Sequence, residues 1–440
     1  MKAGFGESII TPPLGLELSG YFNERIADGV LDDLRSRALV VSDDESTVAI
    51  VIADVLCIPY ADVLAVREEV AKRTGIPGEH VLVAATHTHT GPVTNLQYGR
   101  TLDKAYMQMW HRQTASAVET AYLNMQDARL SVGRGALPHV AFNRRFRMKN
   151  GKVHTNPGIM NPEIDTVAGP VDPTVTIARF DDLHGQPIGV LTHFGCHPDT
   201  TGGNKYSADW FGVAAKYIQL VLGEMLEASA QPPGVVVLCG PAGNINHINV
   251  HDPQRKRRWP RPTLEIGVGL AMETIRVFTN LGHPVDDADV EVDAARKMVS
   301  LECMSPTEFI ELSRQALADP KTGSMERRRA ESNLAAYDPQ APYDESIAAE
   351  VQCLRIGPLL VAGAPGECFC EFGIAFKEAL PNMTAITVNL ANGALGYIPT
   401  ESAYREGGYE PRTTRLVLGS GEAILDAQIE LAKALCGDWS

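Results

Sequence analysis

Apolar runs alternate with amphipathic helical patterns along most of the chain, and this alternation is the feature that most limits how the chain can fold. Several runs are rich in Val and Ile and lack polar alternation, as is typical of strands buried on both faces. Helical patterns between such strands favour a layered α/β fold. We therefore predict a large mixed β-sheet flanked by helices. The strand-like runs are 38–42, 47–55, 80–85, 174–180, 187–194, 234–240, 359–364 and 384–391, and the main helical patterns are 61–73, 105–125, 209–228, 263–281 and 421–437.

Residues 301–345 differ from the rest of the chain, because they form charged helical patterns rich in Arg, Glu and Ala. We interpret them as a helical insertion on the surface that would form an interface or a lid. The sequence contains no internal repeat and no long low-complexity linker. We therefore predict that residues 1–440 form a single domain that carries this insertion.

The charge balance restricts the partners. The chain has 39 Lys and Arg against 54 Asp and Glu, a formal net charge of -15, which argues against nucleic acid or an anionic membrane as the main partner.

No apolar run is long enough to insert in a membrane, and the N-terminus lacks a signal-peptide pattern, so we expect a cytoplasmic location. The eight cysteines are scattered, so we expect reduced thiols. The sequence leaves a homo-oligomer open.

Two strand-like runs end in histidine. The segment AATHTHTGP carries His87 and His89, and LTHFGCHP carries His193 and His197. On an extended strand end, residues two apart point to the same face, so we expect His87 and His89 to face one space. His193 lies inside its run and reads as a packed histidine. For one isolated pair of histidines, ordinary hydrogen-bonded side chains are the alternative. Two strand ends that both carry histidine favour a zinc centre with an open coordination position.

Two more strand-like runs end beside a candidate ligand. Glu367 follows a Pro-Gly turn at the start of a helical pattern, where the positive end of the helix dipole favours a carboxylate. Tyr397 lies in a Gly-Tyr-Ile-Pro turn after 384–391. Helix capping by Glu367 and simple packing of Tyr397 remain alternatives. Cys368 and Cys370 are interpreted as small core residues rather than ligands.

These motifs resemble the catalytic domain of the neutral/alkaline non-lysosomal ceramidases, zinc amidases that cleave the N-acyl bond of ceramide. The resemblance runs over nearly the whole chain, and its most specific elements are ATHTHTGP and GYIPTESAY followed by YE. The chain ends near Ser440, so we expect the family's C-terminal immunoglobulin-like domain to be missing, together with a secretion signal. The other matching segments are SIITPPLGLELSGY, IADVL, FNRR, GCHP, GPAGNIN and PGE.

The resemblance implies roles for particular residues. His89 would stand beside the metal as a supporting or substrate-polarising residue. Arg144, in FNRR, would be the active-site arginine, and Tyr409 would stabilise the oxyanion. The implied zinc ligands are His87, His197, Glu367 and Tyr397.

One loop departs from the family pattern. Where the family has Gly-Asp-x-Ser-Pro-Asn, this chain has GNINH at 243–247. The carboxylate often proposed as the general base is therefore Asn244, and the serine that contacts the substrate head group is Asn246. We keep both as substrate-binding candidates, and His247 as a catalytic candidate in place of the lost carboxylate. The departure leaves the base open, and it leaves open whether ceramide is the substrate.

We predict a zinc-dependent hydrolase that cleaves an amide bond of a small or medium substrate by means of a metal-bound hydroxide, since zinc lowers the pKa of bound water towards ~7. Tyr409 and His89 would donate hydrogen bonds to the oxyanion, and His89 or His247 would protonate the leaving nitrogen. Arg144 would bind a carboxylate or another acceptor on the substrate. The alternatives are an esterase or lactonase with the same zinc site, and a catalytically inactive binding protein.

Overall fold

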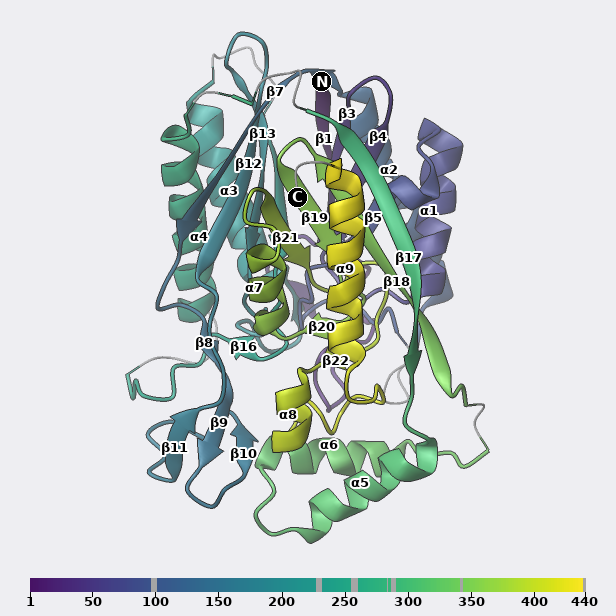
Figure 1. Ribbon diagram of the computed structural model, residues 1–440, viewed down its shortest axis with the longest axis vertical. Helices are drawn as coiled ribbons and strands as arrows, with labels where there is room; N and C mark the ends of the chain where they lie inside the picture. The colour runs from purple at the N-terminus through teal and green to yellow at the C-terminus, as the bar shows by residue number, and fades with distance from the viewer. Residues whose placement is uncertain are drawn as a thin grey trace.

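The computed structural model describes residues 1–95, 101–226, 232–254, 260–282, 284–285, 290–340 and 343–437 (Figure 1). It contains three main sheets that pack against one another and are covered by helices on their outer faces. The predicted mixed α/β architecture is confirmed, and the strands are divided among these sheets. The sequence also contains a strongly basic run at 255–262, which we expect to be a solvated loop, a rim of the pocket or a subunit contact. Residues 255–259 of this run lie outside the described residues, so that expectation stays a prediction.

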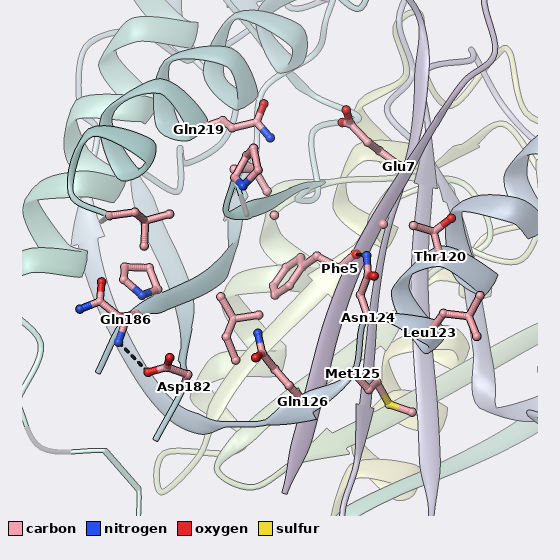
Figure 2. Close-up of a pocket in the computed structure, with 17 residues that line it drawn as sticks. Phe5, Glu7, Thr120, Leu123, Asn124, Met125, Gln126, Asp182, Gln186 and Gln219 are labelled. Atoms are coloured by element: carbon pink, nitrogen blue, oxygen red, sulfur yellow. Dashed lines mark hydrogen bonds between the residues drawn. The ribbon is translucent and has the colours of Figure 1, made fainter. Parts of the chain in front are cut away.

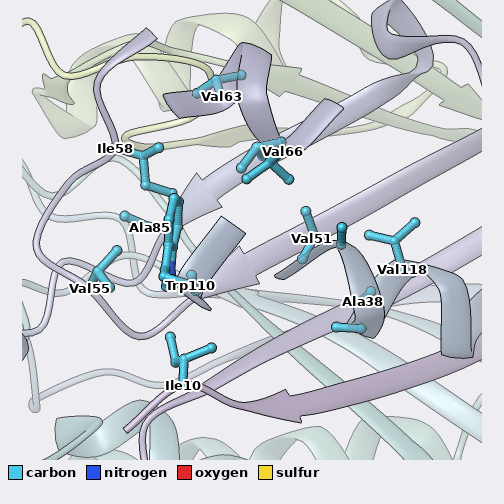
Figure 3. Close-up of a cluster of buried hydrophobic side chains, with 14 of the residues drawn as sticks. Ile10, Ala38, Val51, Val55, Ile58, Val63, Val66, Ala85, Trp110 and Val118 are labelled. Carbon is cyan, nitrogen blue, oxygen red and sulfur yellow. The ribbon is translucent and has the colours of Figure 1, made fainter. Parts of the chain in front are cut away.

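The first sheet has the order β5-β4-β3-β1-β6 and is mixed, because β4 pairs in parallel with β5 and the other strands pair antiparallel. Its outer face is covered by two helices, α1 (Tyr60–Thr74) and α2 (Lys104–Leu123). Figure 3 shows the buried cluster in this layer, where Trp110 of α2 lies among Val and Ile side chains. The strands are β1 (Lys2–Ile9), β3 (Arg35–Ser42), β4 (Thr47–Ala53), β5 (Val81–Ala85) and β6 (Gln126–Asp127).

The second sheet has the order β15-β13-β12-β7 and is covered by α3 (Asp209–Glu224) and α4 (Arg261–Thr279). The third sheet has the order β17-β18-β19-β21 and is covered by α7 (Cys370–Glu378) and α9 (Ser420–Cys436). Their strands are β7 (Arg129–Ala136), β12 (Thr174–Asp181), β13 (Pro187–Phe194), β15 (Gly234–Cys239), β17 (Val292–Glu302), β18 (Ser346–Ile356), β19 (Leu359–Gly363) and β21 (Thr384–Val388).

A central core joins the inner faces of all three sheets. Ile50 of β4, Leu191 of β13 and Val361 of β19 belong to this one buried cluster. Alternate residues of β4, such as Val51, instead face the helices α1 and α2. Both faces of these strands are therefore buried, which explains why their sequences are continuously apolar.

The segment 301–345 contains the two predicted helices, α5 (Pro306–Ala318) and α6 (Ser324–Ala335). They connect β17 to β18, which pair antiparallel along their full length. The serine at the start of α5, Ser305, forms a capping box with Glu308, which satisfies backbone N–H groups at the helix start. In Figure 1 the two helices lie at the lower end of the molecule, next to the small sheet of β9 (Arg145–Met148), β10 (Val153–Thr155) and β11 (Ile164–Val167).

Most predicted strands and helices agree with the structure to within a few residues. The sequence analysis missed β7, β17, β18 and the small sheet, because these strands carry many polar or exposed residues. Nine of the eleven residues of β17 are not buried, so its apolar pattern is weak. All eight cysteines are buried free thiols, and none of the described helices is long and apolar enough to span a bilayer.

Candidate metal centre

His87 and His89 lie in the turn that follows β5. The strand ends at Ala85, and His87 has a left-handed backbone with φ 71°. Our expectation of an extended strand end at this point was therefore wrong. The turn still brings the two rings together, with their Nε2 atoms 3.4 Å apart.

His197 reaches the same point from the second sheet, three residues after β13. Its Nε2 atom lies 3.2 Å from Nε2 of His87 and 3.2 Å from Nε2 of His89. A carbonyl of the GNINH loop, that of Ile245, accepts a hydrogen bond from the backbone N–H of His197 at 3.3 Å. Three imidazole nitrogens from two separate sheets therefore converge in the arrangement expected of a metal site.

Backbone carbonyls fix the tautomers of two of these rings. The Nδ1 atom of His87 lies 2.7 Å from the Leu56 carbonyl oxygen, and Nδ1 of His197 lies 3.4 Å from the Ala242 carbonyl oxygen. Because a carbonyl can only accept, each Nδ1 carries the proton and each Nε2 of a neutral ring presents a lone pair. Two lone pairs at 3.2 Å repel each other unless a cation lies between them.

Glu367 and Tyr397 are brought together by strand pairing. The short strands β20 (Glu367–Cys368) and β22 (Tyr397–Ile398) are parallel, and these two residues are direct partners in the register. The carboxylate of Glu367 extends toward the histidines, with Oε2 3.3 Å from Nε2 of His87 and 3.9 Å from Nε2 of His197. Oε2 of Glu367 is buried and accepts no other hydrogen bond among the described residues, so it is available to a cation.

Burial keeps the cluster in the protonation states that metal ligands need. It lowers the pKa of His89 to about 3 and lowers the pKa of His197 well below its usual value, so both rings are neutral near pH 7. Burial alone would raise the pKa of Glu367, but its neighbours His87 and Arg144 outweigh this effect, and the pKa is lowered. The carboxyl is therefore ionised. Imidazole nitrogens and a carboxylate form a donor set that fits zinc.

A cavity of about 150 Å³ lies next to the cluster. Tyr409 lines it with its ring 5.6 Å from that of Tyr397, and the Arg144 guanidinium lies 5.3 Å from the Tyr397 ring centre. Burial raises the pKa of Tyr409, so its phenol keeps its proton and can donate a hydrogen bond. The predicted site residues that line this cavity are His87, His89, Arg144, His197, Asn246, Glu367, Tyr397 and Tyr409.

Two predicted site residues lie outside this lining. The side chain of Asn244 accepts a hydrogen bond from the backbone N–H of Cys370 at 2.9 Å and donates one to Glu371 at 2.8 Å. It therefore holds the first turn of α7 in place. His247 is buried close to Asp209, at the start of α3.

Tyr21, Asn156, Asp199 and Arg329 are among the further lining residues that the sequence analysis missed as individual site residues. Tyr21 donates a hydrogen bond to Asp199, and its ring lies 5.6 Å from that of His89. Tyr21 belongs to the motif LSGY, and Asp199 belongs to CHPD, two residues after His197. These motifs could have identified both residues as site candidates. Asn156 and Arg329 gave no such signal, since one lies in a loop without a motif and the other on the inserted helix α6.

A larger cavity, about 700 Å³, lies elsewhere (Figure 2). Phe5, Asn124, Gln126 and Gln219 are among its lining residues, and it contains no group of metal-ligating side chains among the described residues. Its lining includes Leu226 and Pro232. The candidate metal ligands line the smaller cavity.

Comparisons with known proteins point to one family. A family model described as "Neutral/alkaline non-lysosomal ceramidase, N-terminal" matches residues 1–237. A "Neutral ceramidase" of Mycobacterium tuberculosis is 24% identical over 489 residues, which cover 94% of this chain and 74% of that protein. "Neutral ceramidase A" of Dictyostelium discoideum is 26% identical over 185 residues, 39% of this chain and 25% of that protein.

Solved structures give the same result for the fold. The crystal structure of neutral ceramidase from Pseudomonas aeruginosa superimposes with a TM-score of 0.76 at 20% identity, covering 99% of this chain and 74% of that one. A second structure, "Ceramidase complexed with C2", also gives a TM-score of 0.76, at 19% identity and with coverage of 99% and 75%. At this level of identity the match establishes the shared architecture.

Proposed function

This chain belongs to the neutral/alkaline non-lysosomal ceramidase family, and we propose that it is a zinc-dependent hydrolase that cleaves an amide bond in a compact substrate. The observation that carries the proposal is the convergence of three Nε2 atoms within 3.4 Å of one another, with Oε2 of Glu367 beside them. Part of the same proposal is that residues 1–440 act as one hydrolase domain with a helical insertion at 301–345.

The zinc ligands in this proposal are His87, His197, Glu367 and Tyr397. Two carbonyls orient the first two rings, and strand pairing places the other two side chains next to each other. His89 directs its Nε2 atom at the same point and adds a fifth donor atom. When bound, zinc would polarise the scissile carbonyl and lower the pKa of a water molecule towards ~7.

Other residues that line the cavity would act on the carbonyl oxygen of the substrate. Tyr409 donates a hydrogen bond to that oxygen as negative charge develops, because burial keeps the phenol protonated. Arg144 adds a fixed positive charge next to Tyr397 and holds its own position through Glu410, at 3.0 Å from Nε to the carboxylate. Asn246 shapes the wall, with Nδ2 2.9 Å from Oδ1 of Asn156.

The cavity size bears on the substrate. A volume of about 150 Å³ is smaller than the roughly 300–1,000 Å³ typical of pockets for drug-sized ligands. We therefore propose a compact amide rather than a ligand with long chains. An ester or lactone of similar size would meet the same groups, because the oxyanion and the polarised carbonyl are common to all acyl transfers.

The test combines metal removal with a substrate panel. Purified protein is assayed with short N-acyl amino compounds, cyclic amides, aryl esters and lactones, before and after chelation and after zinc is restored. The expected result is amide hydrolysis that disappears with the chelator and returns with zinc. Hydrolysis of esters or lactones alone would replace the amidase assignment, and turnover that is indifferent to the chelator would refute the metal centre.

A further inference from the structure

The ring of His89 is held in a different way from the other two rings of the metal cluster. Nδ1 of His87 and Nδ1 of His197 each face a backbone carbonyl oxygen. Nδ1 of His89 is also buried, but it forms no hydrogen bond among the described residues. A hydrogen bond from the second ring nitrogen is what usually orients a histidine at a metal. Other contacts must therefore set the position of His89.

Arg25 forms several hydrogen bonds around His89. Its side chain is buried, and its Nη2 atom donates one hydrogen bond to the carbonyl oxygen of His89 at 2.6 Å and another to that of Ser19. Its Nη1 atom donates to the carbonyl oxygen of Gly203 at 2.9 Å. Gly203 lies in the loop that follows His197. One guanidinium therefore connects the turn that carries His89 with the loop that follows His197.

The ring of Tyr21 lies between this guanidinium and the imidazole. The guanidinium carbon of Arg25 lies 4.1 Å from the centre of the Tyr21 ring, an attractive contact that is strongest away from water. The Tyr21 ring meets the His89 ring edge to face, with centres 5.6 Å apart. Its hydroxyl donates a hydrogen bond to Asp199, so the tyrosine is held both at its face and at its tip. Arg25 thus supports His89 at its backbone directly and at its ring through Tyr21.

The shape of a guanidinium suits this double contact. Its N–H donors lie in one rigid plane, so a single side chain can reach three carbonyls and still cover an aromatic ring. A lysine carries its donors at one point and cannot reach all of them. The N–H of His89 donates to the Pro198 carbonyl at 3.4 Å, which is long for a hydrogen bond. Among these contacts, the hydrogen bond from Arg25 is the firmer hold on the His89 backbone.

We propose that Arg25 is a positioning residue of the metal centre. It keeps Nε2 of His89 directed at the point where Nε2 of His87 and Nε2 of His197 converge. The consequence for turnover rests on the proposed function, whereas the orientation of the ring is a property of the protein without metal. Loss of Arg25 should leave the four proposed zinc ligands in place and remove only the contribution of His89, which lines the cavity.

The first measurement needs neither metal nor turnover. Metal-free protein is labelled with carbon-13 in its histidine rings, and the signal of His89 is identified by its loss in His89→Ala. Arg25→Met should shift or split this signal, because the ring loses its support through Tyr21 and takes more than one orientation. The signal of His193, whose Nε2 lies 2.8 Å from the Thr387 carbonyl oxygen, should not move. An unchanged His89 signal in folded Arg25→Met protein would overturn the positioning role.

Arg179→Met is the matched control for the loss of a stacked arginine. The Arg179 guanidinium lies 4.3 Å from the centre of the Phe278 ring and donates to the Phe278 carbonyl at 3.0 Å, and neither residue lines the cavity. This variant should leave the His89 signal unchanged. Arg25→Lys keeps a positive charge over the Tyr21 ring but not the planar set of donors. It should restore the signal in part, and it serves if the Met variant does not fold.

Kinetics of the zinc-loaded protein show whether Arg25 acts through His89. Arg25→Met should lower kcat about 10- to 100-fold, the range for groups that support a residue at a metal, while KM and zinc content change little. In the His89→Ala background, Arg25→Met should cost nothing further, because the residue it positions is already absent.

The outcomes separate this inference from the proposed function. Additive losses in the double variant, or normal kcat in Arg25→Met, would reject the positioning role and leave the proposed function standing. A His89 signal that moves in Arg25→Met, in a protein that hydrolyses no amide, would uphold the positioning role and reject the proposed function.

Discussion

The Nε2 atoms of His87 and His197 lie 3.2 Å apart, although 110 positions separate the two residues in the chain. Nδ1 of each ring faces a backbone carbonyl oxygen, so in the neutral rings the Nε2 atoms that face each other are both acceptors. A cation between them would remove the repulsion. This relationship is the structural basis of the proposed zinc centre, and most of the predictions below depend on it.

Replacing His87 by Ala should remove stoichiometric zinc from the purified protein. Even supporting contacts to a metal-bound histidine are worth ~10- to 100-fold in affinity, so loss of a ligand should cost more than ~100-fold. Metal content by mass spectrometry and hydrolase activity should fall together. The exposed His184 provides the control, since its replacement by Ala should change neither. A His87→Ala protein with one zinc and full activity would end the assignment.

Gly20→Ala should displace His89 and reduce activity. A Cβ at Gly20 would lie 2.7 Å from Cα and 2.8 Å from Cβ of His89, too close for either backbone to remain where it is. Gly15→Ala is the matched control, because its φ of 92° is also left-handed but nothing lies within 4 Å of the added Cβ. Both variants should lose about 1–2 kcal/mol of stability in denaturant unfolding from backbone strain. Only the Gly20 variant should lose turnover, and equal activity in the two variants would count against the contact.

Tyr409→Phe should lower kcat while zinc content stays the same. Removal of one oxyanion donor typically costs about 100- to 1,000-fold in kcat. Tyr404, which donates to the Leu416 carbonyl at 2.7 Å, is the control, and its Phe variant should retain activity. Single-turnover kinetics measure the chemical step directly. A Tyr409→Phe protein with normal kcat would show that the phenol does not contact the reacting carbonyl.

Glu410→Gln should destabilise the protein by ~3–5 kcal/mol, because it removes the charge shared by two buried guanidinium groups. Glu410 is fully buried and pairs with Arg144 at 3.0 Å and with Arg145 at 2.8 Å. The exposed pair of Glu401 with Arg405 is the comparison, and Glu401→Gln should cost less than about 1 kcal/mol. Urea unfolding at pH 7 measures both. Similar costs for the two variants would contradict the buried network.

The free energy of unfolding should decrease as the pH rises from about 4 to about 6, because the Asp32 carboxyl loses its proton in this range. Burial raises the pKa of this carboxyl from 3.8 to about 6, against the opposing effect of hydrogen bonds from Ser207 and Ala208. The folded state then binds the proton more tightly than the unfolded state, so stability falls through this window and is flat above it.

The measurement for Asp32 is urea unfolding of the wild type and Asp32→Asn at pH 4 and pH 7. The stability of the wild type relative to the Asn variant should be ~1–3 kcal/mol greater at pH 4, because the variant has no proton to lose. A difference that does not change with pH would show that this carboxyl titrates normally in the folded state.

Much of the fold follows from local pattern. The continuous Val and Ile runs of β4, β13 and β19 predict buried strands because each needs apolar contacts on both faces, and the structure supplies them. The helices 105–125 and 421–437 have the spacing of one apolar face and appear as α2 and α9. The exposed β17 gave only a weak pattern. The motifs also identified eight of the residues that line the cavity, since each motif places a distinctive side chain in a turn.

The arrangement around the histidines has no local cause. His87 faces His89 through a left-handed residue, not through the two-residue period of a strand. The carbonyls of Leu56 and Ala242 that orient the rings belong to a backbone that is the same in every sequence, so no motif identifies them. Arg329 enters the cavity only because α6 packs there, and Asn244 supports α7 instead of lining the cavity. The local sequence determines which side chains are present and how apolar residues are spaced. The orientation of the histidine rings, their tautomers and their proximity depend on contacts between segments that are far apart in the chain.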